Sequence, residues 1–345
     1  MTHKNISKIL IILILFILIF SGCSNKKISE PKSKTNFLLG TVITLKIYDN
    51  PKDEIFTKSF DRIKDIENKM SINIDNSEVI RINENAGENY IKVSNDTFNV
   101  INKGKYYSKL SNGNFDITIG PLVKLWNIGT ENAKVPTEKQ INLKLPLINY
   151  KNIILSEKEN KVKLEKKDMI LDLGGIAKGY AADEVSNILE NNDVHHAIIN
   201  LGGNIYVHGS KVDGTPWKIG IQNPFEPRGD YIGIVKTKNK SIVTSGIYER
   251  YFEENGKRYH HILDPSNGYP VRNKLAGVSL IADKSIDADA LSTVLFSMGI
   301  KEGKRLAENL DGVDAVFITK DKSVHITDNL KNNFEITNSN FKKIE

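Results

Sequence analysis

The segment LDLGGIAKGYAAD, residues 171–183, contains the signals on which the fold and the candidate site depend. The apolar run at residues 169–173 predicts a strand, which leads through two glycines into a helix over residues 179–189. Gly174 and Gly175 allow a ligand to approach the backbone closely, and a helix N-terminus offers free N–H groups to an anion. Lys178 adds a positive charge suited to phosphate, and Asp172 is a hydrogen-bond acceptor for a base or a sugar. The same residues also fit a plain strand–turn–helix junction.

Helices and strands follow one another along the rest of the chain without a regular βαβ order. Helical spacing predicts further helices over residues 55–69, 97–110 (broken or bent at Gly104) and 287–298. Alternating or β-branched runs predict strands over residues 38–48, 197–207, 217–222, 231–236 and 277–282, and a closing hairpin from 315–319 and 324–327. This order favours an α+β fold over a doubly wound sheet.

Composition excludes several classes of protein. The length of 345 residues predicts one large domain or two closely packed lobes. A formal net charge of +6 without a dense basic stripe does not indicate nucleic-acid binding. The single cysteine excludes an internal disulfide, a cysteine zinc site and an iron–sulfur cluster. The 24 glycines include no G-x-G spacing, so the dinucleotide fingerprint and the Walker phosphate loop are absent.

The N-terminus has the features of a lipoprotein signal. Lys4 and Lys8 precede an apolar run, residues 9–20, which is shorter than the roughly 20 residues of a spanning helix. Ser21 and Gly22 come before Cys23, as in a bacterial lipobox, although a signal anchor with an incidental cysteine has the same pattern. We therefore expect a signal peptide (1–22), a lipidated Cys23, a flexible tether (23–35), a folded domain (36–335) and a C-terminal tail (336–345). Such a protein is anchored by lipid to the extracytoplasmic face of the cell membrane.

Two further segments contain candidate metal and phosphate ligands. Asp289 and Thr293 are four residues apart, so their oxygens lie on one face of the predicted helix. A carboxylate and a hydroxyl, with a backbone carbonyl, are hard ligands suited to Mg²⁺. An acidic residue in a first helical turn is also explained by the helix dipole alone. Residues 243–250 include Thr, Ser and Arg side chains that suit phosphate or metal-bound water, or they form a simple strand and turn.

The remaining candidates are a histidine pair and a buried aspartate. His260 and His261 end a predicted strand before a turn at residues 264–268, where an imidazole can contact phosphate or move a proton. Two surface histidines beside a hairpin are the alternative. Asp116 lies in an apolar run after Phe115, and a buried aspartate needs either a structural hydrogen-bond network or a ligand.

Together these segments resemble the ApbE family of FAD:protein FMN transferases, many of which are lipoproteins. Eight matching motifs occur in order across nearly all of residues 36–330: LGT (39–41), MS with SE (70–71 and 77–78), SNGNFDIT (111–118), LDLGGIAKGY (171–180), NLGGN (200–204), TSG (244–246), HILDP (261–265) and DALST (289–293).

The resemblance implies a T-fold-like α+β architecture with two closely packed lobes and FAD in the cleft between them. It implies Mg²⁺ held by the side chains of Asp289 and Thr293 and a backbone oxygen of Gly175, with His261 near the pyrophosphate. The residues that would line FAD are Leu39, Asn73, Asn114, Phe115, Asp116, Asp172, Lys178 and Ile262. Family members often have an aromatic residue at the position of Asn73, so asparagine there predicts a more open and wetter site.

The family reaction transfers FMN from FAD to a threonine hydroxyl of a target protein and releases AMP. The implied partners are FAD and acceptor flavoproteins of membrane electron-transfer systems. His261, Asp287 and Asp289 are all open as the general base. Two alternatives use the same site: hydrolysis of FAD to FMN and AMP, or flavin binding without turnover.

Overall fold

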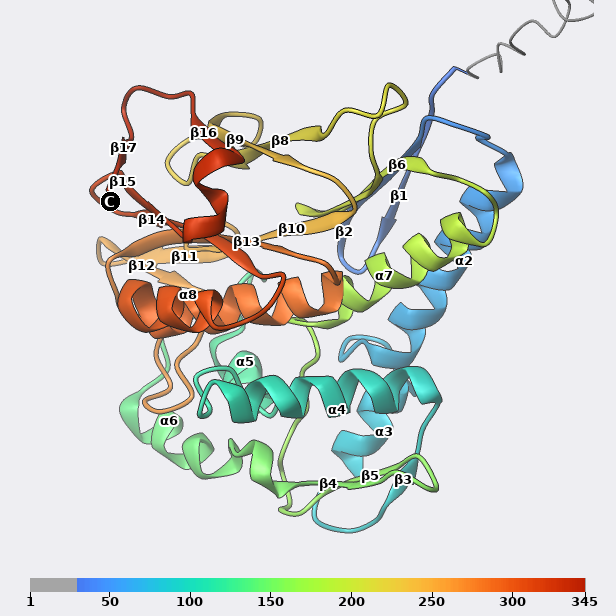
Figure 1. Ribbon diagram of the computed structural model, residues 1–345. Helices are drawn as coiled ribbons and strands as arrows, with labels where there is room; N and C mark the ends of the chain where they lie inside the picture. Colours follow the sequence, from blue (N-terminus) through green and yellow to red (C-terminus); the bar gives the residue numbers. More distant parts are fainter. Residues whose placement is uncertain (1–29, 345) are drawn as a thin grey trace, which may run out of the picture. The chain divides into compact units, whose positions relative to one another are not determined.

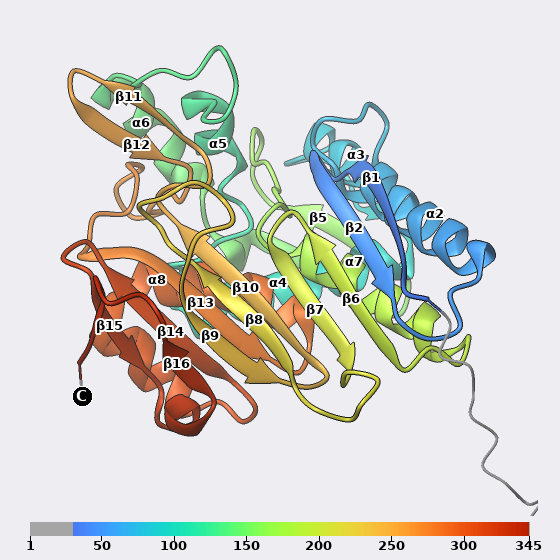
Figure 2. The ribbon, with the colours of Figure 1, turned by 90° about the horizontal axis from the view of Figure 1, so that it is seen from above.

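A nine-stranded sheet forms the centre of the protein, in the order β1-β2-β6-β7-β10-β13-β14-β15-β17 (Figures 1 and 2). The structure is a computed structural model that describes residues 30–344, which form one compact unit from Pro31 onwards. Neighbouring strands of the large sheet pair antiparallel, except for the parallel pair β15 and β17. Largely antiparallel pairing with helices beside the sheet confirms the predicted α+β class.

The helices of the described chain are α2 (Asp53–Met70), α3 (Glu78–Glu84), α4 (Asn95–Leu110), α5 (Gly120–Trp126), α6 (Glu138–Lys144), α7 (Ala177–Glu190) and α8 (Ser285–Glu308). The strands of the large sheet are β1 (Lys32–Leu38), β2 (Thr41–Ile47), β6 (His196–Leu201), β7 (Asn204–Gly209), β10 (Lys240–Gly246), β13 (Leu275–Ala282), β14 (Asp314–Thr319), β15 (Ser323–Ile326) and β17 (Lys342–Lys343). Three smaller sheets contain β3 (Ile91–Lys92), β5 (Lys161–Leu164) and β4 (Ile153–Ser156); β16 (Phe334–Ile336), β9 (Tyr231–Thr237) and β8 (Trp217–Gln222); and β11 (Tyr251–Glu254) with β12 (Lys257–His260).

Both faces of the large sheet are covered. Helices α7 and α8 lie along one face (Figure 1), where Leu291 of α8 and Leu280 of β13 share a core cluster. The β8-β9-β16 sheet covers the other face, where Trp217 of β8 packs in one cluster with Ile281 of β13. Burial from two sides explains why all eight residues of β13 are buried. Hydrophobic burial of this extent makes β13 and α8 a rigid support for side chains at their ends.

The second part of the protein consists of α3 to α6 and the small β3-β5-β4 sheet, which lie below α7 and α8 in Figure 1. Phe98 and Ile101 of α4 belong to the same core cluster as Leu291 of α8. The two parts therefore share one hydrophobic core, as expected for closely packed lobes. Figure 2 shows the β11–β12 hairpin beside α5 and α6, and Trp126 of α5 packs against Tyr259 of β12 at 5.5 Å between ring centroids.

Several predicted boundaries are wrong. The expected strand over residues 38–48 is confirmed as β2 from Thr41 to Ile47, but it begins three residues later than predicted, because Leu38 ends β1 and a turn at Leu39 and Gly40 joins the two strands. Strand β1 begins at Lys32, so the end of the predicted tether (23–35) belongs to the large sheet. The predicted tail (336–345) supplies the end of β16 and all of β17, and its Phe341 is buried in the core beside the β8-β9-β16 sheet. These segments are ordered because each adds backbone hydrogen bonds or apolar contacts to an existing layer.

Other elements differ in detail. The run 197–207 is the hairpin β6–β7, because Gly202 and Gly203 form its turn with positive φ angles. Helix α4 continues through Gly104, where an added Cβ would lie 2.8 Å from Ile117, so this glycine permits close packing and does not break the helix. The helices over 55–69, 179–189 and 287–298 and the hairpin β14–β15 are confirmed.

The signal peptide, Cys23 and the first part of the tether lie outside the described residues. Within residues 30–344, no helix has the length and apolar composition that crossing a membrane requires.

Candidate active site

The glycine segment at 171–183 leads into α7, but its first part is not the predicted strand. Ile170 makes only an isolated bridge to Ile119, and Asp172 donates its N–H to the carbonyl of Ile117. The side chain of Asn83 bonds both the N–H and the carbonyl of Leu171 (2.7 and 3.1 Å). An amide side chain thus satisfies the backbone groups that a neighbouring strand would otherwise pair, so the extended segment needs no sheet.

The turn after this segment is closed by its own side chains. Asp172 Oδ1 accepts a hydrogen bond from the N–H of Gly174 at 2.8 Å, and Lys178 Nζ donates to the Gly174 carbonyl at 3.2 Å. A Cβ on Gly175 would lie 3.1 Å from Phe115 and 4.0 Å from Thr293 Oγ1. The turn therefore lies between the aromatic ring of Phe115 and the hydroxyl of Thr293 on α8, while the binding of FAD and Mg²⁺ by these residues stays a prediction.

Helix α8 contributes the oxygen atoms of the site. Asp289 is 4% exposed; its Oδ2 accepts the backbone N–H of Gly179 at 2.9 Å, and its Oδ1 lies 3.6 Å from Lys178 Nζ. Ser245, at the end of β10, is hydrogen-bonded to Ser292 Oγ (2.8 Å) and Thr293 Oγ1 (3.3 Å). The expected pair of oxygens on one helical face is confirmed, and β10 adds a hydroxyl to it.

The position of α8 depends on a residue whose role the sequence did not reveal. Asp183 of α7 accepts the N–H groups of Ser285 and Ile286 at 2.8 and 2.9 Å, because the residue before α8, Lys284, offers no side-chain cap. Burial raises the pKa of Asp183 to about 6, although these two hydrogen bonds oppose the rise. An aspartate that caps a helix about a hundred residues later has no local sequence signal.

The oxygen donors fit Mg²⁺. In the described part of the chain, no three His, Cys, Asp or Glu side chains are close enough to one another to form a metal site. The donors near Gly175 are one carboxylate (Asp289) and the hydroxyls of Thr293 and Ser245. One carboxylate with neutral oxygens is the donor set of a Mg²⁺ ion that keeps several waters and binds phosphates.

Charged groups gather on the other side of the turn. His261 donates its N–H to the carbonyl of Arg250 (3.1 Å), and its Nδ1 lies 3.3 Å from the same oxygen. A carbonyl only accepts, so Nδ1 carries the proton and Nε2 of the neutral ring is free to accept one. Burial, and next the positive charge of Arg250, lower the pKa of His261 to about 3. His261 is therefore neutral at neutral pH.

Asp172 is the acidic member of this group. Burial raises the pKa of its carboxyl, whereas the Gly174 hydrogen bond and the charges of Arg250 and Lys178 lower it. Arg250 therefore acts on both Asp172 and His261, and it forms no ion pair with any residue in 30–344. Gly129, in the loop after α5, supports the Arg250 chain, because a Cβ there would lie 3.4 Å from Arg250 Cδ. Arg250 and Ser245 both come from the segment 243–250 that the sequence marked as a phosphate or metal-water segment.

The other predicted flavin residues bond to backbone or side-chain groups of the protein. Leu39 has a φ of 54° in the β1–β2 turn and donates its N–H to Glu67 Oε1 at 2.8 Å. Asn73 is exposed and donates its N–H to Ser71 Oγ, while Asn114 Nδ2 bonds the Ser111 carbonyl. Ile262 is buried and accepts the N–H of Val271 at 2.9 Å. Their contacts with FAD remain predictions.

Two of the open questions from the sequence are answered by contacts. Asp116 accepts the N–H and the hydroxyl of Thr118 and the N–H of Tyr150 at 2.7 to 2.8 Å, so its buried carboxylate belongs to a structural network. Asp287 forms an ion pair with Lys103 of α4 at 2.9 Å, and no sequence pattern predicted this contact. The pairing removes Asp287 from the best candidates for a general base.

The fold and this site define a flavin transferase family. The family model described as "ApbE family" matches residues 39–317, and this chain belongs to that family. FAD:protein FMN transferase of Klebsiella pneumoniae is 38% identical over 89% of this chain and 95% of its own length. The enzyme of the same name from Treponema pallidum is 31% identical over 93% of each chain.

Solved structures show the same architecture. The ApbE protein of Thermotoga maritima superimposes with a TM-score of 0.80, at 33% identity, over 88% of this chain and 98% of its own. The flavin transferase ApbE of Vibrio cholerae superimposes with a TM-score of 0.79, at 26% identity, over 88% and 99% of the two chains. The predicted ApbE-like α+β architecture is confirmed.

Proposed function

We propose that this protein is a Mg²⁺-dependent transferase that moves FMN from FAD onto a threonine hydroxyl of a target protein and releases AMP. Membership of the family and the name of its curated relatives support FMN transfer. The observation that carries the proposal is the pairing of an oxygen cluster, Asp289 with Thr293 and Ser245, with a neutral histidine and two cations beside the same glycine turn.

Asp289, Thr293 and a backbone oxygen of Gly175 are the residues that would hold Mg²⁺. When bound there, Mg²⁺ supplies charge neutralisation for the pyrophosphate and makes its phosphorus more electrophilic. Lys178 and Arg250 add positive charge: Arg250 forms no ion pair with any residue in 30–344, and Lys178 lies 3.6 Å from Asp289. Both side chains therefore favour an anionic substrate.

His261 is the best candidate for the general base. Its Nδ1–H donates a hydrogen bond to the Arg250 carbonyl, so Nε2 is the basic atom. The ring is uncharged at neutral pH. In the reaction, the acceptor hydroxyl oxygen forms a bond to the phosphorus of the FMN half. The bond from that phosphorus to the bridging oxygen breaks, AMP leaves with the bridging electron pair, and the hydroxyl proton passes to Nε2. Bound pyrophosphate charges raise the basicity of Nε2 when the base is needed.

The test is AMP release and protein-bound flavin fluorescence after incubation with FAD, Mg²⁺ and a co-expressed acceptor flavoprotein. We expect AMP only when acceptor is present, and a fluorescent acceptor band that survives denaturing electrophoresis. His261→Gln and Asp289→Asn should abolish both signals. Asp213→Asn, in an exposed turn, is the matched control and should change neither. Intact FAD recovered from the wild-type reaction would refute both transfer and hydrolysis.

The exposed Asn73 is the specific reason to measure AMP without acceptor. Asparagine is smaller than the aromatic residue that family members often have here, so water has more access to the site. AMP formed at the same rate without acceptor would identify the protein as an FAD hydrolase that uses the same site.

We also propose that the enzyme is anchored by lipid on Cys23 at the extracytoplasmic face of the cell membrane, where its acceptors would be flavoproteins of membrane electron-transfer systems. The lipobox-like sequence before Cys23 supports this, and so does the start of the folded part soon after it, at Lys32. Labelling of growing cells with radioactive palmitate tests the anchor. Loss of label and release from membranes in Cys23→Ser are expected; label retained in that variant would exclude Cys23.

A further inference from the structure

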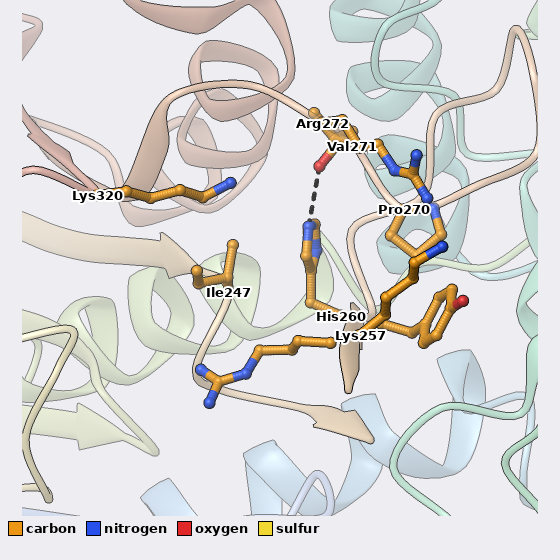
Figure 3. A pocket seen from close by; sticks show the side chains of 9 residues that line it. Ile247, Lys257, His260, Pro270, Val271, Arg272 and Lys320 are labelled. Atoms are coloured by element: carbon orange, nitrogen blue, oxygen red, sulfur yellow. Dashed lines mark hydrogen bonds between the residues drawn. The ribbon is translucent and has the colours of Figure 1, made fainter. Parts of the chain in front are cut away.

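A pocket of about 530 Å³ lies beside the β11–β12 hairpin and contains none of the residues predicted to bind FAD or Mg²⁺ (Figure 3). One wall is β12 from Lys257 to His260, and the opposite wall is the segment from Pro270 to Arg272. Ile247 and Lys320 also line it and lie on the same side of His260 in Figure 3. Its volume falls within the range of small-molecule sites.

The rim of the pocket is strongly basic. Lys257, Arg258, Arg272 and Lys320 line it, and no acidic side chain is among the nine lining residues. Arg258 is paired with Glu253 at 3.0 Å, and Lys320 Nζ donates to the Asn273 carbonyl at 2.9 Å. Lys257 and Arg272 form no ion pair with any residue that the structure describes. Lys257 and Arg272 lie on the same side of His260 in Figure 3, and neither has a counter-charge among the described residues, so an anion between them would be stabilising.

The floor of the pocket is apolar and fixed. Pro270, Val271 and His260 are buried, and Ile247 is partly buried. His260 Nε2 donates to the Val271 carbonyl at 3.0 Å, which links the two walls (Figure 3). Burial lowers the pKa of His260 to about 4, so the ring adds no charge at neutral pH. A ligand that fits is therefore an anion with an apolar or ring-shaped body.

The pocket is separate from the catalytic residues but shares a backbone wall with them. His260 is the last residue of β12, and His261 follows it in a bend. His260 lines the pocket, whereas His261 contacts Arg250. The N–H of Val271, on the pocket side, bonds the carbonyl of Ile262, which follows His261.

We propose that this pocket is a second anion site that binds a phosphate monoester, with the phosphate between Lys257 and Arg272 and the organic body on the floor of Pro270, Val271 and Ile247. A phosphate monoester carries close to two negative charges at neutral pH, which suits several cations better than a single carboxylate does. The ligand has two sources that share this chemistry: a soluble nucleotide monophosphate, or the headgroup of phosphatidic acid in a membrane.

Calorimetric titration with AMP tests the soluble source. FAD in excess fills the catalytic site, and EDTA prevents turnover, so AMP binding reports the pocket. We expect Lys257→Ala/Arg272→Ala to bind AMP at least about tenfold more weakly than the wild type, because two charge-assisted contacts are lost. Lys218→Ala/Lys342→Ala removes two exposed cations from β8 and β17 and should bind as the wild type does.

Sedimentation with phosphatidylcholine vesicles that contain phosphatidic acid tests the membrane source, with the same two double variants. Vesicle binding that depends on Lys257 and Arg272, without AMP binding, assigns the pocket to the headgroup. The proposal would be overturned if the wild type and the two double variants bound AMP equally and also bound the vesicles equally. It would also be overturned if the wild type showed no saturable binding of either probe. Neither assay needs FMN transfer, so its result is independent of the proposed function.

Discussion

Asp289 Oδ2 accepts a 2.9 Å hydrogen bond from the backbone N–H of Gly179, so one carboxylate joins α8 to the first turn of α7. Its other oxygen faces Lys178 at 3.6 Å. The same side chain therefore orients two helices and presents one oxygen to the site. A substitution at Asp289 has a structural effect and a chemical effect, and the two can be separated.

Asp289→Asn and Asp289→Ala should both abolish AMP release, because each removes the carboxylate that would hold Mg²⁺ together with Thr293. The asparagine retains an oxygen for the Gly179 N–H, so it should unfold close to the wild-type denaturant midpoint, whereas alanine should lose about 1 to 3 kcal/mol of stability. Unchanged AMP release by either variant at low Mg²⁺ would refute the metal assignment.

Gly179→Ala should be strongly destabilising. A Cβ at this position would lie 2.2 Å from the carbonyl oxygen of Ser285, which is backbone and cannot rotate away. We expect a loss of about 2 to 3 kcal/mol in the free energy of unfolding measured with urea. Gly214→Ala is the comparison: its φ is +79° but its surroundings are open, so only backbone strain of about 1 kcal/mol applies. A smaller loss for Gly179→Ala than for Gly214→Ala would contradict the close helix contact.

His261 should not titrate between pH 5 and pH 8 in the protein without FAD, because burial and Arg250 lower its pKa to about 3. Proton NMR of the ring hydrogens measures this directly, with His261→Gln to assign the signal. FAD should raise the pKa, since its pyrophosphate brings negative charge to the imidazolium form. A ring that already titrates near pH 6.5 without FAD would show that it is not buried as described.

Asp287→Asn should retain most of the AMP release, because the wild-type carboxylate is held in an ion pair with Lys103 at 2.9 Å. His261→Gln should release AMP more slowly than the wild type by a factor on the order of a hundred or more, because a general base usually contributes that much to the rate. Initial rates at saturating FAD and Mg²⁺ compare the two. The reverse ranking would assign the base to Asp287.

Asp183 makes stability depend on pH in the acid range. Its native pKa of about 6 exceeds the value of 3.8 that an aspartate has in the unfolded chain, so between these values the native state binds more protons than the unfolded state. The contribution of this group is therefore fully present below about pH 4 and is lost as the pH rises through 6. Relative to Asp183→Asn, the wild type should lose on the order of 2 to 3 kcal/mol between pH 4 and pH 7. A pH-independent difference between the two urea curves would contradict the raised pKa.

Local sequence signals predicted the elements that have their own periodicity. The helices α2, α7 and the first part of α8 were expected because their apolar residues recur at helical spacing, and Asp289 and Thr293 share a face for the same reason. The β1–β2 turn was missed because Leu39 is not a turn residue, yet it adopts a φ of 54°. The expected strand at 169–173 was wrong because side-chain bonds from Asn83 take the place of a neighbouring strand.

The sequence alone determined the α+β class, the family, and the chemical groups of the site, since residue types and short spacings are local properties. Tertiary structure alone decided which groups meet. It placed Ser245 beside Thr293 and Lys103 against Asp287, each across a long stretch of chain, and it brought Arg250 and His261 together across the β11–β12 hairpin. Such contacts depend on the packing of α7 and α8 on the sheet. Hydrophobic burial determines that packing, and no single segment of the sequence contains a pattern that predicts it.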